Sequence, residues 1–228
     1  SVSENTAVGS NALYTNDSGL GLTAVGFQSL YNNNTGASNT AVGHSALFTN
    51  NAGVNNTAIG HSALYANTIG SGNTALGLET LKENITGTDN VAIGFRALLS
   101  NNGLLAHYNI AVGTETLGSN LDGTRNIGIG HEALGAVETA NDNVAVGFNA
   151  LLNNTVSGNT AMGSNALNIN DTGLGLTAIG FNSLYNNTAN YNTAIGYHTL
   201  FTNSTGTSNV AIGTNALSKN NSNVLNVA

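Results

Sequence analysis

A short pattern of small, aliphatic and polar positions, Asn-Thr-Ala-Val-Gly-His-Ser-Ala-Leu at 39–47, repeats along the whole chain. The pattern is centred on a glycine that occurs thirteen times, mostly 17 residues apart, with two gaps of 16 and one of 19. These glycines are Gly9, Gly26, Gly43, Gly60, Gly77, Gly94, Gly113, Gly130, Gly147, Gly163, Gly180, Gly196 and Gly213. A tandem period of this length predicts a solenoid, in which each coil buries its apolar side only against its neighbours.

The positions around the glycine, which we number 0, indicate strands rather than helices. Position +4 is Leu in every copy, −1 is aliphatic or Met, −3 is β-branched, and −2 is Ala except at Gly128. Positions −3 and −1 share one face of a strand, whereas a helix would tolerate a glycine in each repeat poorly. We therefore expect a short strand ending at the glycine, a tight corner, and a second short strand centred on the Leu. The predicted fold is all-β, a parallel β-solenoid (β-roll) of about 13 coils with a period of about 17 residues, in a single repetitive domain over residues 1–228.

The alanine at −2 lies on the strand face opposite the aliphatic residues, which we expect to form the core. Because Ala is almost invariant there, some other group must approach that face closely. We expect this group to be another copy of the chain, since a slender coil encloses a thin core and gains stability by burying a second face.

Asparagine also recurs in register. It stands at −4 in eleven copies, with Leu22 and Leu176 as departures, and at +7 in twelve copies, with Val137 as the departure. Identical amides stacked about 4.8 Å apart can form hydrogen-bonded ladders, as in cross-β stacks. We expect both rows to be structural rather than ligand-binding.

Composition excludes several classes of partner. The net charge is −7 with only four Lys and Arg, so the chain lacks the basic patch that nucleic acid or an anionic membrane requires. It has no Cys, which excludes disulfides and thiolate metal sites. No apolar run approaches the ~20 residues of a membrane span, so we expect no membrane insertion in this chain.

We find no catalytic, cofactor-binding or metal-binding motif in the sequence, and we expect no enzymatic activity. Glu79, Glu115 and Glu132 share position +2 with Arg96 between them, which indicates a solvated face. His44 and His61 occupy +1 in consecutive coils, where two imidazoles stack but make a weak metal site without further ligands.

Aromatic residues recur at +5 and at +1. They stabilise a solenoid or a contact between chains, or, if exposed, grip carbohydrate or a host surface. Their positions are Tyr14, Tyr31, Phe48, Tyr65, Tyr185 and Phe201 at +5, and Phe27, Phe95, Phe148, Phe181 and Tyr197 at +1. The 19-residue gap adds two residues within Leu104–Tyr108, which we expect to bulge at a corner without disturbing the coils.

Two copies of the motif carry a resemblance to a known family. The units Asn90–Gly94 and Asn209–Gly213 (NVAIG), followed by Ala97 and Ala216, resemble the head repeats of trimeric autotransporter adhesins. The NTAVG units resemble repeat arrays of phage and large-virus tail-fibre proteins and bacterial surface proteins. The resemblance implies a left-handed β-roll, three chains side by side, and an extracellular role in adhesion or as a fibre shaft. The adhesin repeats are shorter than the 17 residues found here.

Three functional hypotheses follow. The first is a non-enzymatic structural protein, the shaft or head of an extracellular adhesin or tail fibre, assembled as a homotrimer. The second is a subunit that polymerises end to end, because repeats begin by Asn5 and no polar cap is visible at either end. The third is an ice- or carbohydrate-binding face built from the five Thr at −3 in the first five coils, although Val91 and Ile110 take over that position in the next coils, which suits an inward-facing site better.

Overall fold

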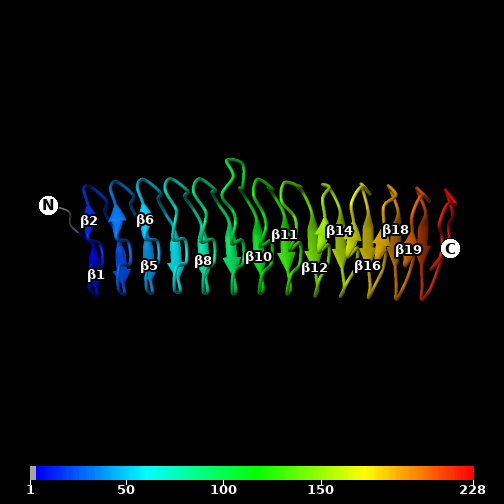
Figure 1. Cartoon of the computed structure of the whole chain (residues 1–228), viewed down its shortest axis with the longest axis horizontal. Coiled ribbons are helices and arrows are strands. Elements are labelled where there is room, and N and C mark those ends of the chain that lie inside the picture. The colour runs from blue at the N-terminus through cyan, green and yellow to red at the C-terminus, as the bar shows by residue number, and fades with distance from the viewer. Residues whose placement is uncertain (1–3) are drawn as a thin grey trace.

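The chain winds into a rod of stacked coils with its two ends at opposite tips (Figure 1). The computed structural model describes residues 4–228. Each coil contributes one three-residue strand, and these strands form a single thirteen-stranded sheet along the rod. The strands are β1 (Thr6–Val8), β3 (Thr23–Val25), β5 (Thr40–Val42), β7 (Thr57–Ile59), β8 (Thr74–Leu76), β9 (Val91–Ile93), β10 (Ile110–Val112), β11 (Ile127–Ile129), β12 (Val144–Val146), β14 (Thr160–Met162), β16 (Thr177–Ile179), β18 (Thr193–Ile195) and β20 (Val210–Ile212).

Pairing within this sheet is parallel and joins equivalent positions of successive repeats. Thr40 lies opposite Thr57, Ala41 opposite Ala58, and Val42 opposite Ile59. The same register holds across the 19-residue gap, where Ile110 lies opposite Val91. The predicted parallel β-solenoid with a period of about 17 residues is therefore confirmed.

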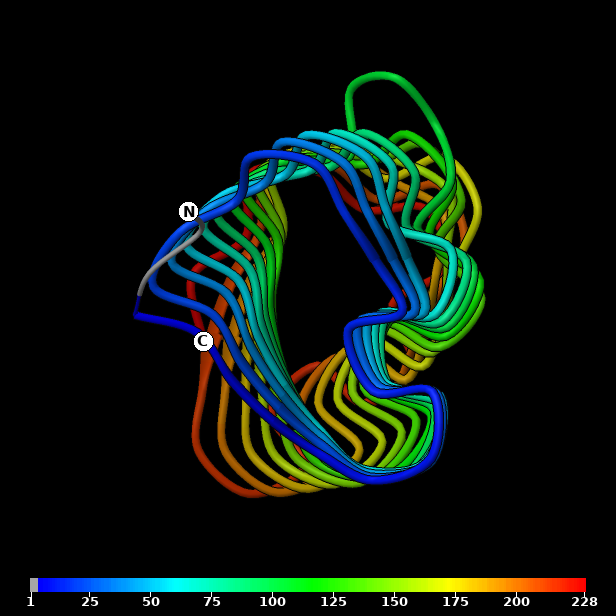
Figure 2. The same ribbon diagram turned by 90° about the vertical axis from the view of Figure 1, so that its left-hand side faces the viewer.

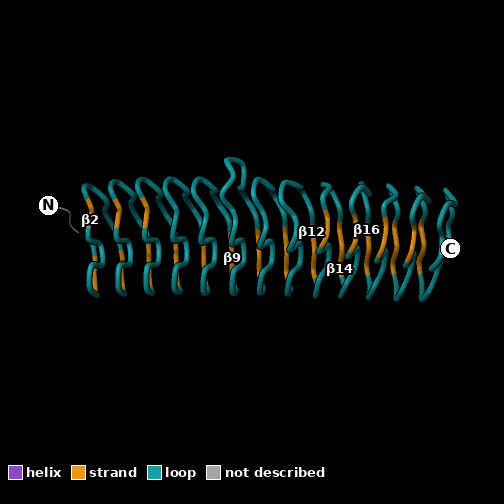
Figure 3. The backbone as a smooth tube through the Cα atoms, viewed as in Figure 1, coloured by secondary structure: helices purple, strands orange, loops and turns teal. Residues whose placement is uncertain are grey.

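A second row of two-residue strands flanks the central part of the rod but is absent from it (Figure 3). One group is β2 (Thr15–Asn16), β4 (Asn32–Asn33) and β6 (Thr49–Asn50), and the other is β13 (Asn153–Asn154), β15 (Ile169–Asn170), β17 (Asn186–Asn187) and β19 (Thr202–Asn203). Thr, Asn or Ile opens each of these strands, whereas Ala, Glu or Ser stands there in the middle coils. In those coils the next amide instead closes a local turn, as where the Asn67 N–H donates to the Leu64 carbonyl oxygen (3.3 Å).

The prediction of a second strand centred on the Leu was wrong. The +4 Leu lies in a turn, two residues before the second-row strand, with a left-handed backbone (φ 46–56°) in all thirteen copies. Its side chain reaches the core from this turn, so the leucine row is a packing feature and not a strand signal.

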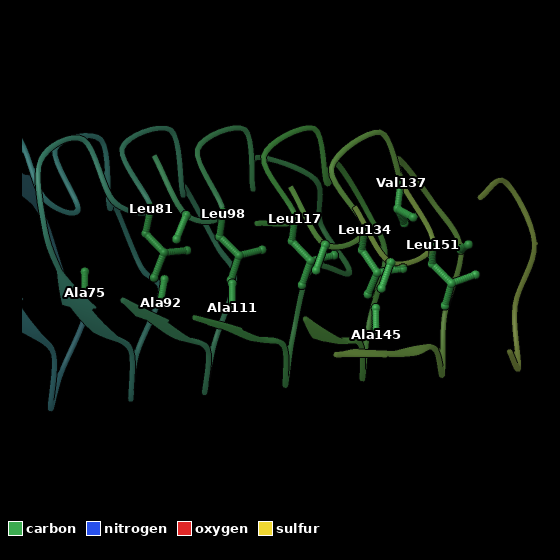
Figure 4. Close-up of a cluster of buried hydrophobic side chains, with 14 of the residues drawn as sticks. Ala75, Leu81, Ala92, Leu98, Ala111, Leu117, Leu134, Val137, Ala145 and Leu151 are labelled. Atoms are coloured by element: carbon green, nitrogen blue, oxygen red, sulfur yellow. The ribbon is translucent and has the colours of Figure 1, made fainter. Parts of the chain in front are cut away.

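The core lies between the sheet and this row of leucines. Figure 4 shows Ala92 directed toward Leu81 and Ala111 directed toward Leu98, in each case the leucine of the preceding coil. Ala92 and Leu81 are both 0% exposed within the single chain. We had expected the alanines to contact another copy of the chain. That expectation was wrong, because they are buried within one chain. Ala recurs because the coil is so narrow that only a methyl group fits opposite the leucine.

The aliphatic residues at −1 point outward, which reverses the expected core face. Ile129 is 42% exposed and Ile59 39% exposed. The β-branched residues at −3, such as Thr40 and Val91, lie on the same outer side and are half-buried. The sheet thus turns its small residues inward and its larger apolar residues toward solvent.

The predicted corner at position 0 is confirmed. Gly60 has φ +135°, and a Cβ there would lie 2.3 Å from the carbonyl oxygen of Gly77 in the next coil. Only glycine accommodates both this backbone and this approach. The two additional residues of the long repeat project as a loop beyond the neighbouring coils (Figure 2), with Leu104 75% exposed. Because they are absorbed outside the sheet, the bulge leaves the coils in register, as predicted.

Candidate interaction surfaces

The asparagines at +7 form a buried amide ladder along the rod, as predicted. The Asn50 Nδ2 donates to Asn33 Oδ1 of the preceding coil (2.8 Å) and to the Gly53 carbonyl oxygen of its own coil (2.9 Å). The Asn67 Nδ2 repeats both bonds one coil later, each at 2.8 Å. Both of these side chains are fully buried and each Nδ2 makes two hydrogen bonds, which offsets the cost of burying an amide.

Val137 interrupts this ladder. It occupies the position where an amide would donate to the coil before it, and it is fully buried. Consequently the buried Asn120 Oδ1 has no hydrogen-bond partner among residues 4–228.

The asparagines at −4 form a second buried ladder of a different kind. The Asn56 Oδ1 accepts the backbone N–H of Asn73 in the next coil (3.0 Å), and its Nδ2 donates to the Gly70 carbonyl oxygen (2.8 Å). At the departure Leu22, the backbone N–H still donates to Asn5 Oδ1 (2.9 Å). A different side chain at −4 therefore leaves in place the bond from its own backbone N–H to the asparagine of the preceding coil.

The outer side of the thirteen-stranded sheet is a strip of aliphatic and threonine side chains, which we call the outer face. It consists of the side chains at −3 and −1, flanked past the corner by those at +1. None of the thirteen copies carries Asp, Glu, Lys or Arg at any of these three positions. Its most exposed aliphatic members at −1 are Val8, Ile59, Leu76, Ile93, Ile129, Met162, Ile179 and Ile212.

Rings at +1 stack along one edge of the outer face. The ring centroids of His44 and His61 lie 4.8 Å apart, and the Phe27 ring lies 5.1 Å from His44, tilted by 33°. Within residues 4–228, no group of three or more His, Asp or Glu side chains is placed to hold a metal ion. The rings of His44 and His61 are stacked within 10° of parallel, which is the coil-to-coil stacking predicted from the sequence.

A second ring stack at +5 lies outside the outer face. Tyr14, Tyr31, Phe48 and Tyr65 follow one another with centroids 4.9 Å apart and planes within 7° of parallel. Because each inner ring covers the face of its neighbour, the row offers ring edges rather than free faces. Sugar binding normally uses free aromatic faces, so this geometry does not favour the carbohydrate hypothesis.

A shallow groove opens in the middle of the rod, where Gly118 and Gly135 occupy +5, a position that is aromatic, Lys or Leu in most other coils. It has a volume of about 390 Å³, and its lining includes Leu99 and Leu152. Glu115 and Glu132 line one side, both half-exposed. Arg96, the third +2 residue here, is turned toward Glu79, with Nε 2.7 Å from Oε2.

The remaining close ion pairs hold carboxylates ionised near the surface. Lys82 bonds Glu79 Oε1 at 2.6 Å and, with Arg96, holds the pKa of the Glu79 carboxyl below its usual value. Arg125 bonds Asp142 through two nitrogens, at 2.6 and 2.9 Å, and lowers the pKa of that carboxyl. Both clusters stabilise the charged form of an acid, whereas a general acid at neutral pH needs a raised pKa.

Comparison with protein-family models, curated proteins and solved structures finds no match for this chain. The resemblance to adhesin heads and fibre repeats thus remains a prediction from the motif. Among residues 4–228 there is no helix with the length and apolar character that crossing a membrane requires. The features on which function can be argued are the two axial amide ladders and the outer face.

Proposed function

We propose that this protein is a self-associating structural rod, the repetitive shaft or head of an extracellular adhesin or fibre. The observation that carries the proposal is the continuity of bonding along the rod axis. The sheet runs through all thirteen repeats, and the buried amides of the −4 and +7 rows add bonds between neighbouring coils.

This bonding suits a shaft because several separate rows of hydrogen bonds join each coil to the next. Each coil is joined to the next by backbone bonds at the sheet, at the corner and at the leucine turn, as where the Gly60 N–H donates to Val42 and the Leu47 N–H to Ala63. Stability in such an array is a sum of coil and interface terms, so the rod can be lengthened by adding repeats. At about 4.8 Å per coil, thirteen coils give a rod roughly 60 Å long.

Light scattering after size exclusion, over about a hundredfold range of concentration, tests the proposal. We expect a mass above that of one chain, and narrow straight particles by negative-stain electron microscopy. A mass fixed at a small number of chains favours a shaft or head, and a mass that climbs with concentration favours end-to-end filaments. A single-chain mass at every concentration would contradict the proposal.

Ice binding is a second candidate, because the structure reverses the main argument against it. We expected position −3 to face inward, but Thr23, Thr40 and Thr57 lie in line on the outer side of the sheet. A regular outward row of hydroxyl and methyl groups can order water. A thermal-hysteresis assay on the intact chain checks this candidate, which competes with self-association for the same face.

A further inference from the structure

From the exposure of the sheet we infer that the outer face is the surface on which a second copy of this chain docks, side by side along the rod. The inference deepens the proposed function and rests on it, because it assigns the self-association of the rod to particular residues. The outer face thereby takes the place of the alanine row as the expected contact between chains, because the alanines are buried within one chain.

The outer face carries aliphatic side chains at −1 over its whole length, beside threonine or an aliphatic residue at −3, and it has no Asp, Glu, Lys or Arg. Exposed aliphatic residues at −1 extend from Val8 near one tip to Ile212 near the other, 58% and 60% exposed. Charged residues stand elsewhere on the coil, for example Glu79 and Arg96 at +2. Soluble monomers rarely expose contiguous apolar patches larger than a few hundred Å², and larger ones mark interaction sites.

The area matches what a stable pair of proteins needs. A strand of three residues is about 10 Å wide, so a rod of roughly 60 Å presents about 600 Å² of sheet on each copy. The ring row at +1 widens this strip. Two copies would bury at least about 1,200 Å² in total, which lies at the lower end of the range for specific interfaces.

The repeat spacing indicates that the partner is another copy of this chain. Side chains on the outer face form ridges one coil apart, since equivalent residues such as Ile93 and Val112 are paired in register. Packing ridges into grooves along the whole rod needs a partner with a long sheet of the same interstrand spacing. A second copy of this chain supplies such a sheet of equal length.

The test places charge on the outer face and, as a matched control, on another part of the coil. Ile93→Lys with Ile129→Lys puts two ammonium groups in the middle of the proposed interface. Ile69→Lys with Ile85→Lys makes the same chemical change at residues 56% and 43% exposed on the return loop. Mass is measured by light scattering over the concentration range in which the unchanged chain associates.

We expect the Ile93/Ile129 pair to raise the dissociation constant at least about tenfold, because docking would bury unpaired ammonium groups. The Ile69/Ile85 pair should associate like the unchanged chain. Far-UV circular dichroism establishes that both variants are folded. If the Lys variant does not fold, Ile93→Thr with Ile129→Thr removes apolar area while keeping a residue suited to strands, and should weaken association in the same direction.

The outcomes separate this inference from the proposed function. If the unchanged chain associates and the folded Ile93/Ile129 variant does so equally well, the outer face is not the interface, while the rod function stands. Equal loss in both variant pairs would also overturn the assignment, because the effect would then come from added charge anywhere. A single-chain mass for the unchanged protein would overturn both proposals.

Discussion

At the scale of single residues, the two rows of asparagine were predictable and their consequences at one position were not. The sequence shows both the +7 row and its one departure at Val137. Because the side-chain oxygen in this row accepts from the amide one coil later, the departure leaves its effect on the preceding coil. The structure places that effect on the buried Asn120 Oδ1, which has no partner in the described part of the chain.

Replacing Asn by Val and replacing Val by Asn in the +7 row should therefore change the stability of the rod by unequal amounts. Asn67→Val removes the donor to Asn50 Oδ1 and the acceptor of Asn84 Nδ2, and should destabilise the rod by about 2–4 kcal/mol, since buried groups lose their partners. Val137→Asn supplies the missing donor to Asn120 while losing about 1.5 kcal/mol of aliphatic burial, so its net effect should stay within about 1 kcal/mol.

Urea unfolding of both variants, followed by far-UV circular dichroism, measures this difference. Midpoints should be compared directly, because repeat arrays depart from two-state behaviour. A midpoint for Asn67→Val as high as that of Val137→Asn would mean that the ladder contributes little to stability.

At the scale of one element, the sequence predicted the strand but not its orientation. Alternation shows which residues share a face, here −3 with −1, and is silent on which face is inside. We assigned the larger residues to the core, as in most sheets. In this solenoid the reverse holds, because the space between Ala92 and Leu81 of the preceding coil admits only a methyl group. The residue types of the outer face could be predicted from the sequence. That these residues are exposed to solvent could be seen only in the structure.

Ala92→Leu tests this orientation. Both sides of the site are fully buried, so the added methylene and methyl groups would force the sheet away from the leucine turn and cost about 1–3 kcal/mol or more. The neighbouring Ile93→Leu changes an outward side chain of similar volume and should cost less than about 1 kcal/mol. Thermal unfolding measures the loss of stability in both variants. Weakened association with an unchanged melting temperature in Ala92→Leu would show that the alanines do lie between chains.

At the scale of the whole molecule, charge and apolar surface are separated, and this separation determines how association should respond to salt. Each copy carries a net charge of −7, while the outer face carries none of the charged side chains. Two docked rods would therefore attract one another through apolar contact and repel one another through their remaining surfaces. Salt shortens the Debye length from about 14 Å near 50 mM to about 4 Å near 500 mM, which screens the repulsion and leaves the apolar contact intact.

Raising sodium chloride over that range should accordingly tighten association, by a few-fold in the dissociation constant, and ammonium sulfate should tighten it further because sulfate strengthens apolar burial. Sedimentation velocity at a fixed protein concentration follows the change. The Ile69→Lys/Ile85→Lys variant, with a net charge less negative by two, should show a smaller response to sodium chloride. Association that weakens as sodium chloride rises would instead indicate an interface held by ion pairs between the chains, and would move the docking surface away from the sheet.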